Sequence, residues 1–221
     1  MHLAAANGDT DMIRLLVRSG ANVNGRAGDQ KPPINLAAAS PANLDAIRTM
    51  LELGADIRPV DGKRQTAMHY AARRPNVATL QYLKHKGLDL EAEDTARMRP
   101  IHLAAACGHV NVVRYLGSQA GVDVNQKTHD GWSAVHSAAR TNQAEVIEVL
   151  IKELGADPTL TDREGQIALH IVAGKNHVEA ARVLINCGVN INMVDAQGLR
   201  AADIAAEKGF LELAKELRPS E

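Results

Sequence analysis

The residues of this chain best suited to chemistry are its nine histidines. Imidazole serves as a zinc ligand and as a general base, but either role needs further groups at a defined spacing. His85 and His129 lack a cysteine, histidine or carboxylate at the ligand spacing of a zinc site. The remaining seven recur at two fixed positions, the first occupied by His2, His69, His102, His136 and His170 and the second by His109 and His177. This regularity indicates a structural role, and we expect neither a metal site nor a cofactor.

A pairing of nucleophile and base is suggested only by Ser133 and His136, which lie three residues apart. Nucleophilic catalysis would also need a group that orients the base and donors that stabilise an oxyanion. Neither is evident, and Ser133 lies where a helix N-cap is expected. The nucleotide-binding, zinc-protease and nucleophile-elbow motifs are missing from the sequence as well. We therefore expect that this chain is not an enzyme.

The first histidine position belongs to a short phrase, Ile-His-Leu-Ala-Ala in its clearest copy, that recurs along the whole chain. The position is occupied in turn by His2, Asn35, His69, His102, His136, His170 and Asp203, so successive copies lie 33 or 34 residues apart. A fixed period of this size indicates an array of repeats, each too small to bury a core alone. The functional question therefore becomes which molecule the array binds.

Each repeat is predicted to hold two helices between a turn and a glycine. In the third repeat Thr66 is the expected N-cap of a short helix that ends before Pro75. A second amphipathic stretch begins at Val77 and stops at Gly87, a residue type that tolerates positive φ. Two other repeats are expected to begin their first helix at a proline, Pro33 in one and Pro100 in the other.

The repeats differ from one another in detail. A hydroxyl stands at the cap position only in Thr66 and Ser133, whereas Arg99, Ile167 and Arg200 replace it elsewhere. Loss of such a cap costs roughly 1 kcal/mol. The repeats are therefore capped unevenly, as in a natural array and not in an idealised design. The second, fourth and fifth repeats carry one extra residue before the glycine, which we expect a loop to absorb. The first repeat lacks its opening turn, so we expect either a piece of a longer protein or an irregular N-terminal edge.

This pattern resembles the ankyrin repeat, which has a 33-residue period and a Thr-Pro-Leu-His phrase. The resemblance covers essentially the whole chain and implies an all-α solenoid of stacked helix-turn-helix units joined by β-turn or hairpin fingers. It also implies that the repeated histidine is a structural hydrogen-bonding residue. We expect one domain over residues 1–221, with seven repeats at about 1–26, 27–60, 61–93, 94–127, 128–161, 162–194 and 195–221.

Asparagines recur after the glycine stop, at Asn24, Asn125 and Asn192. We expect turn residues whose side chains bond their own backbone. The resemblance adds an alternative, because in animal ankyrin proteins this position can be hydroxylated.

Composition narrows the classes of partner and the compartment. The formal net charge is −1, so no global field attracts nucleic acid or a membrane surface. No apolar run reaches the ~18 residues of a membrane span. Cys107 and Cys187 lie two repeats apart, roughly 20 Å at about 10 Å per helix layer, which is too far for a disulfide. The unpaired cysteines favour an intracellular, reducing compartment, with the cytoplasm preferred and the nucleus as the alternative. We also expect the chain to be monomeric by itself.

The resemblance implies a concave binding surface built from the turn tips and the first helices. At those positions basic side chains outnumber carboxylates, while many carboxylates lie on the second helices. This segregation predicts a basic groove over the third to fifth repeats that suits an acidic partner segment. Chance scatter, or local pairing with carboxylates such as Glu93 and Asp94, is the alternative. The candidate partner-binding residues are Lys63, Arg64, Arg73, Arg74, Arg97, Met98, His129, Trp132 and Arg140.

Trp132 is the single tryptophan of the chain and projects from a turn where the pattern needs no large apolar group. It is either a binding anchor, a role in which tryptophan is common, or a support for the neighbouring turn. The leading functional hypothesis is a non-catalytic protein-interaction module. The alternatives are binding of nucleic acid or polyphosphate by an arginine groove, which the 2% aromatic content disfavours, and a targeting arm of a larger enzyme or channel.

Overall fold

The structure is a computed structural model that describes residues 1–40 and 43–218. In this part of the chain every regular element is helical, with fourteen α-helices, one short 3₁₀ turn and one π-helical turn. Among the same residues the only β feature is an isolated antiparallel bridge between Val194 and Arg200. The chain divides into two compact units, Met1–Pro100 and Ile101–Glu221. The all-α fold expected from the sequence is confirmed.

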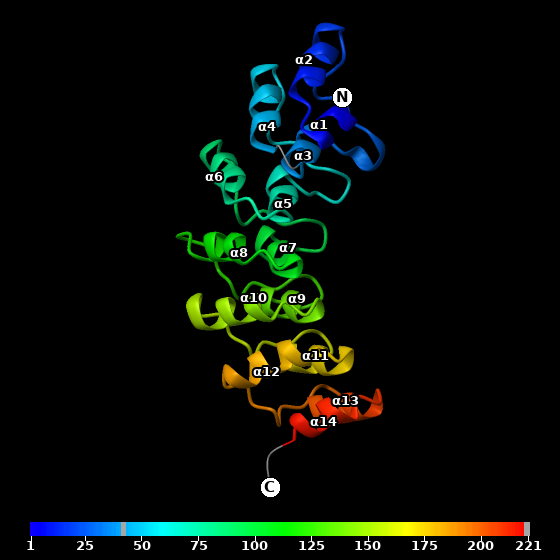
Figure 1. Ribbon diagram of the computed structural model, residues 1–221, viewed down its shortest axis with the longest axis vertical. Helices are drawn as coiled ribbons and strands as arrows, with labels where there is room; N and C mark the ends of the chain where they lie inside the picture. The colour runs from blue at the N-terminus through cyan, green and yellow to red at the C-terminus, as the bar shows by residue number, and fades with distance from the viewer. Residues whose placement is uncertain (41–42, 219–221) are drawn as a thin grey trace. The chain divides into compact units, whose positions relative to one another are not determined.

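The N-terminal unit is built from two layers of helices. The first helices of its repeats, α1, α3 and α5, contact one another in sequence and form one layer. The second helices, α2, α4 and α6, form the other layer (Figure 1). The bounds are α1 (His2–Asn7), α2 (Thr10–Arg18), η1 (Gly28–Gln30), α3 (Pro33–Ala38), α4 (Asn43–Glu52), α5 (Ala67–Ala72) and α6 (Val77–His85).

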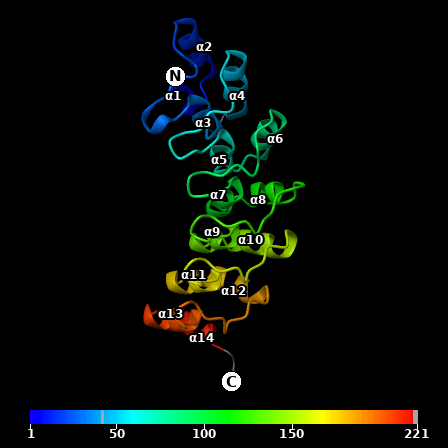
Figure 2. The same ribbon diagram turned by 180° about the vertical axis from the view of Figure 1, so that it is seen from behind.

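The C-terminal unit repeats this plan. In it α9, α11 and α13 form one layer, while α10 packs against α9, α12 against α11 and α14 against α13, as Figure 2 shows from behind. The bounds are α7 (Pro100–Cys107), α8 (Val110–Gly117), α9 (Ala134–Arg140), α10 (Ala144–Glu148), η2 (Val149–Glu153), α11 (Ala168–Lys175), α12 (Val178–Asn186), α13 (Ala201–Glu207) and α14 (Leu211–Glu216).

The starts and stops of these helices follow the local signals of the sequence. Thr66 and Ser133 are the N-caps of α5 and α9, and Gly87 follows the end of α6 at φ 85°. Pro33 and Pro100 are the first residues of α3 and α7. These expectations are confirmed. Layers of small residues hold the helices close together, because alanines such as those in Ala71–Ala72 are completely buried.

Two repeats without a cap hydroxyl obtain the capping interaction from a residue inside the helix. The backbone N–H of Ile167 donates to Nδ1 of His170 over 3.2 Å. The backbone N–H of Arg200 donates to the carboxylate of Asp203 over 3.0 Å. The third helical residue thus satisfies the donor that begins the helix, as in a capping box. Thr66 and Ser133 donate the same backbone bond to His69 and His136, so this bond is kept whether or not the N-cap residue carries a hydroxyl.

The extra residue of the fifth repeat lies inside a helix and not in a loop. After α10 the chain continues as the π-helical turn Val149–Glu153, in which the backbone accommodates one additional residue. Val149 and Leu150 stay buried there, so the apolar face of the helix is kept. The expectation of loop variation is wrong for this repeat. In the fourth repeat the extra residue does lie in the turn between α8 and Gly121, as expected.

Candidate functional site

The turn before each first helix is a closed loop of five residues, here called a finger. In the third repeat the N–H of Asp61 donates to the carbonyl of Gln65 over 3.1 Å. The Oδ1 atom of Asp61 accepts the N–H groups of Lys63 and Gln65, each at 2.8 Å. Sequence reasoning overlooked this aspartate. Its signal is a column eight residues before the repeated histidine, filled by Asp61, Asp94, Thr128, Asp162 and Asp195.

Neighbouring fingers are linked through their backbones. In the N-terminal unit the N–H of Gly62 donates to the carbonyl of Asp29 over 2.7 Å, and that of Thr95 to Lys63 over 2.9 Å. In the C-terminal unit the N–H of Ala196 donates to the carbonyl of Glu164 over 3.0 Å. The finger tips of each unit therefore form a hydrogen-bonded row that fixes the spacing of their side chains.

The repeated histidines attach each first helix to the following finger. Nε2 of His69 contacts the carbonyl of Met98 at 3.0 Å, while its Nδ1 accepts the N–H of Thr66 at 3.2 Å. This pattern assigns a neutral ring that donates from Nε2. Burial lowers the pKa of His69, although the bond to Met98 opposes that shift. The same contact is made by His2 to Lys31, His136 to Gln166 and His170 to Leu199, whereas Nε2 of His102 contacts the carbonyl of Gln126, just before the next finger.

Asn35, which replaces the histidine in the second repeat, makes an equivalent bond. Its Nδ2 donates to the carbonyl of Gln65 over 2.9 Å. Because an amide can replace the imidazole, the link to the next finger needs an N–H donor and no titratable ring.

Three of the predicted basic residues of the N-terminal unit are exposed and carry no ion pair among the described residues, namely Lys63, Arg64 and Arg74. Two others have local partners. Arg73 lies 5.5 Å from the ring centre of Tyr70 and donates to Oε1 of Gln65 at 2.9 Å.

Arg97 forms an ion pair with Glu93 at 3.5 Å, in which the arginine side chain stays 54% exposed. Its neighbour Arg99 forms ion pairs with Glu91 and Glu93, and the Arg99 side chain is only 14% exposed. The hydrogen bond from Arg99 is the main reason that the pKa of Glu93 lies below its usual value. Local pairing, the alternative raised from the sequence, therefore applies to Arg97 and Arg99. Met98 is half-buried, and its carbonyl accepts from His69.

Arg64 and Arg97 occupy an unusual backbone conformation at the tips of their fingers. Their φ angles are 60° and 57°, in the left-handed region. The same finger position in the C-terminal unit is taken by glycines, Gly131, Gly165 and Gly198, at φ 84°, 73° and 80°. A side chain in this region costs roughly 1–2 kcal/mol. Two arginines are therefore kept where the local backbone favours glycine.

In the C-terminal unit His129 belongs to a polar cluster at a finger tip. Arg163 lies 3.1 Å from Nε2 of His129 and 3.8 Å from the carboxylate of Asp130. Asp130 also lies 3.5 Å from Nδ1 of His129. The sequence did not predict this cluster, because the partner Arg163 comes from the next finger.

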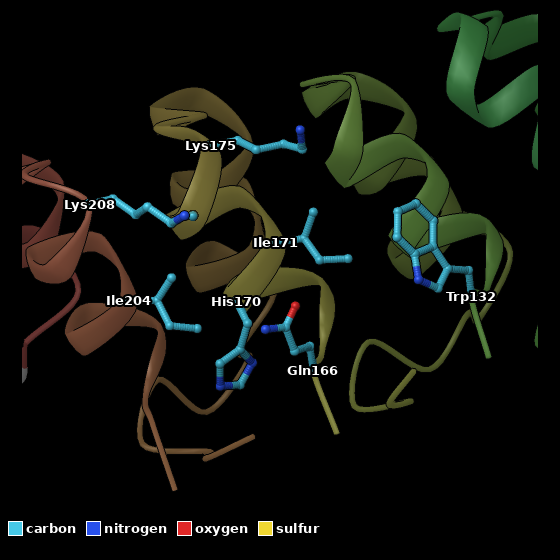
Figure 3. Close-up of a pocket in the computed structure, with 8 residues that line it drawn as sticks. Trp132, Gln166, His170, Ile171, Lys175, Ile204 and Lys208 are labelled. Carbon is cyan, nitrogen blue, oxygen red and sulfur yellow. The ribbon is translucent and has the colours of Figure 1, made fainter. Parts of the chain in front are cut away.

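Trp132 lines a groove of about 330 Å³ in the C-terminal unit (Figure 3). The guanidinium of Arg140 lies 5.5 Å from the centre of its ring system. The groove continues across the next two repeats, and Trp132 is the only one of the nine predicted binding residues among its lining. The other lining residues are Gln166, His170, Ile171, Gly174, Lys175, Ile204 and Lys208.

The predicted binding residues thus fall into two groups that the structure describes separately. Six lie on the fingers and in the turn after α5 in the N-terminal unit, and His129, Trp132 and Arg140 lie in the C-terminal unit. Sequence reasoning missed the isoleucines of the groove and Lys208. A usable signal existed for the lysines, since Lys175 and Lys208 each lie five residues after the repeated histidine position.

The recurring asparagines connect neighbouring repeats. Nδ2 of Asn24 donates to the carbonyl of Gly54 over 3.1 Å, and its Oδ1 accepts the N–H of Asp56 over 2.8 Å. Oδ1 of Asn125 likewise accepts the N–H of Asp157 over 2.8 Å. The expectation that these side chains bond their own backbone is wrong for Asn24 and Asn125, because both reach the turn of the following repeat.

Both cysteines, Cys107 and Cys187, are free thiols. Within residues 1–40 and 43–218, no three histidine, cysteine or acidic side chains gather as a metal would require. In the same described ranges, each helix is too short or too polar to cross a bilayer.

Several known proteins are similar in sequence to stretches of this repeat array. A 134-residue stretch is 31% identical to the Transient receptor potential cation channel subfamily A member 1 homolog of Caenorhabditis elegans, covering 58% of this chain and 11% of that protein. A 72-residue stretch is 36% identical to Ankyrin repeat and SOCS box protein 6 of Mus musculus, covering 32% of this chain and 17% of that protein. A 135-residue stretch is 27% identical to the ankyrin repeat protein YahD of Escherichia coli (strain K12), covering 46% of this chain and 67% of that protein.

The channel and SOCS box relatives are therefore matched over only a small part of their length. A family model described as "Ankyrin repeats (3 copies)" matches residues 1–94, 68–162 and 154–221, which together span the sequence. This match does not count individual repeats, so the number of repeats, seven, and their boundaries stay predictions. The paired helices, the histidine contacts and the family match agree, and the chain belongs to the ankyrin repeat family.

Proposed function

We propose that this chain is a non-catalytic protein-interaction module that binds an acidic segment of a partner protein through its fingers and first helices. Ankyrin repeats generally mediate protein–protein interaction, which supports the class of function. We further propose that it acts as a monomer, without a cofactor, in an intracellular compartment. The candidate contact residues are those predicted from the sequence, with Lys63, Arg64 and Arg74 the most available among the basic side chains.

The observation that carries this proposal is the conformation of Arg64 and Arg97. Both side chains stand at positive φ at finger tips, where glycine would relieve the backbone. Strained residues of this kind concentrate at functional sites, where the strain is retained for the side chain it presents. Arg64 is exposed and makes no ion pair within the described part of the chain. Its retention is best explained by a contact with another molecule.

The charge of the fingers supports a negatively charged partner. The carboxylates of Asp61 and Asp94 are turned inward, where they accept backbone N–H groups of their own fingers. The basic side chains of Lys63, Arg64 and Arg74 point to solvent instead. The field near the N-terminal fingers is therefore more positive than the net charge of −1 indicates.

Binding of nucleic acid or polyphosphate is the alternative class. Single-stranded nucleic acid is commonly held by aromatic platforms, and aromatic residues form only 2% of this chain. A salt titration separates the two, because each phosphate contact steepens the loss of affinity with added salt.

The proposed function is tested by affinity capture with the full chain, followed by mass spectrometry. The test variant carries Lys63→Glu, Arg64→Glu and Arg74→Glu. The control variant carries three reversals of charge at exposed residues on the second-helix side. Proteins lost with the test variant and kept with the control support binding at the fingers, and equal retention overturns it. The control substitutions are Arg18→Glu, Arg48→Glu and Lys86→Glu.

A further inference from the structure

The groove of the C-terminal unit has an apolar floor built from three successive repeats. Trp132 comes from one finger, Ile171 from α11 and Ile204 from α13. Ile171 is 7% exposed and Ile204 is 9% exposed, so each shows solvent only the part that faces the groove. Figure 3 shows Ile171 lying between Trp132 and Ile204, so the three apolar side chains follow one another along the groove.

One edge of this floor is basic. Lys175 and Lys208 are exposed and occupy the same position in consecutive repeats, at the ends of α11 and α13. Figure 3 shows both side chains on the same edge of the groove. Neither ammonium group forms an ion pair or a side-chain hydrogen bond among the described residues. The residues that line the groove include no carboxylate, so the two positive charges are not neutralised inside it.

Gly174 keeps the groove open between the apolar floor and the lysines. A Cβ atom at this position would lie 3.3 Å from Cγ2 of Ile204, closer than an ordinary contact. The equivalent position holds alanine in three other repeats, at Ala6, Ala39 and Ala106. Glycine is a poorer helix former than alanine, and its presence here leaves room at the wall of the groove.

We propose that this groove binds an extended acidic peptide segment, with a large apolar side chain of the peptide seated against Trp132, Ile171 and Ile204 and its carboxylates paired with Lys175 and Lys208. The inference rests on the proposed function and names the chemistry of the partner. Carboxylates are complementary in charge to the two lysines. An apolar side chain such as leucine is complementary to the apolar floor.

The spacing of the lysines specifies the peptide further. Adjacent packed helices lie about 8–10 Å apart, and Lys175 and Lys208 stand on adjacent first helices. In a polyproline II segment, residues three apart share one face and are separated by about 9.3 Å. Acidic residues at every third position therefore match the two ammonium groups, and the residues between them can turn toward the floor.

The test uses the full chain and the peptide acetyl-(Asp-Leu-Pro)4-amide, which has no aromatic residue. Trp132 is the only tryptophan of the chain, so its emission reports on the groove directly. We expect a saturable change of Trp132 emission with the peptide. The change should be lost when asparagine replaces every aspartate, and also when glycine replaces every leucine. Absence of a saturable change with the parent peptide would overturn the proposal.

Isothermal titration then compares variants whose folding is verified by circular dichroism. Gly174→Leu, which fills the groove, and the pair Lys175→Gln with Lys208→Gln should each weaken binding by roughly tenfold or more, as expected for anchor contacts. The matched control, Lys152→Gln with Lys215→Gln on second helices, should bind within about twofold of the parent, because exposed ion pairs contribute little. Equal affinity for all variants would refute the assignment to this groove.

Failure of this inference is distinguishable from failure of the proposed function. If captured proteins are lost with the N-terminal finger variant but kept with Gly174→Leu, the groove proposal is overturned and binding at the basic fingers is supported. If they are lost with Gly174→Leu but kept with the finger variant, the groove is supported and the finger assignment is wrong.

Discussion

Replacing Arg64 by glycine should stabilise the protein. The residue is exposed, lies at φ 60° and forms no ion pair within the described residues, so little is lost with its side chain. Relief of the left-handed conformation is worth roughly 1–2 kcal/mol. The extra conformational freedom of glycine in the unfolded chain costs about 0.5–1 kcal/mol. The difference leaves a net gain of about 0.5–1 kcal/mol.

The assay is urea unfolding followed by far-ultraviolet circular dichroism. With a denaturant slope of about 1–3 kcal/mol per molar urea, the midpoint should rise by roughly 0.2–1 M. Arg64→Ala is the matched control, because it removes the guanidinium but keeps a Cβ atom at positive φ and should give no gain. If glycine and alanine lower the midpoint equally, the backbone of this finger is not strained and the argument from Arg64 to partner binding fails.

Three further predictions follow from the hydrogen bonds of the array. Burial lowers the folded-state pKa of His69 and His136 below the usual 6.5, so the unfolded chain binds more protons in acid. The unfolding free energy should therefore be level above about pH 7.5 and fall below pH 6.5, by at most about 1.4 kcal/mol per pH unit for each ring. Urea titrations from pH 8 to 5 measure this slope, which should be smaller in a double variant with asparagine at both positions. Gly165→Ala would put a Cβ 2.7 Å from the backbone nitrogen of Ala196, and thermal unfolding should show a loss of about 2 kcal/mol or more. Asp94→Ala should cost about 1–3 kcal/mol in urea, whereas a change under 0.5 kcal/mol would show that the finger closes without its carboxylate.

The features that the sequence predicted well are those determined within one repeat. Capping by Thr66, the proline start of α7 at Pro100 and the stop at Gly87 each depend on neighbours a few residues away, and the period multiplies the same signal along the chain. The fold class and the order of the helices follow from such signals.

The features that sequence reasoning missed depend on contacts between repeats. His129 meets Arg163 only because successive fingers lie side by side. The groove joins side chains that are 72 residues apart between Trp132 and Ile204, and the period alone does not reveal which of them face one another. The π-helical turn was missed because an inserted residue in a helix and one in a loop have the same length in the sequence.

The contacts of His69 and His136 have a direction along the chain, since each donor belongs to one repeat and its acceptor carbonyl to the next. An inserted copy of a repeat would bring its own donor for the following finger and offer its own carbonyl to the preceding helix. Lengthening by duplication therefore needs no compensating change at either junction. Asp203 differs, because its carboxylate accepts the N–H of Arg200 and has no proton to donate onward. A duplicate placed after such a repeat would lack this link, so growth by gene duplication is favoured on one side of Asp203 and disfavoured on the other.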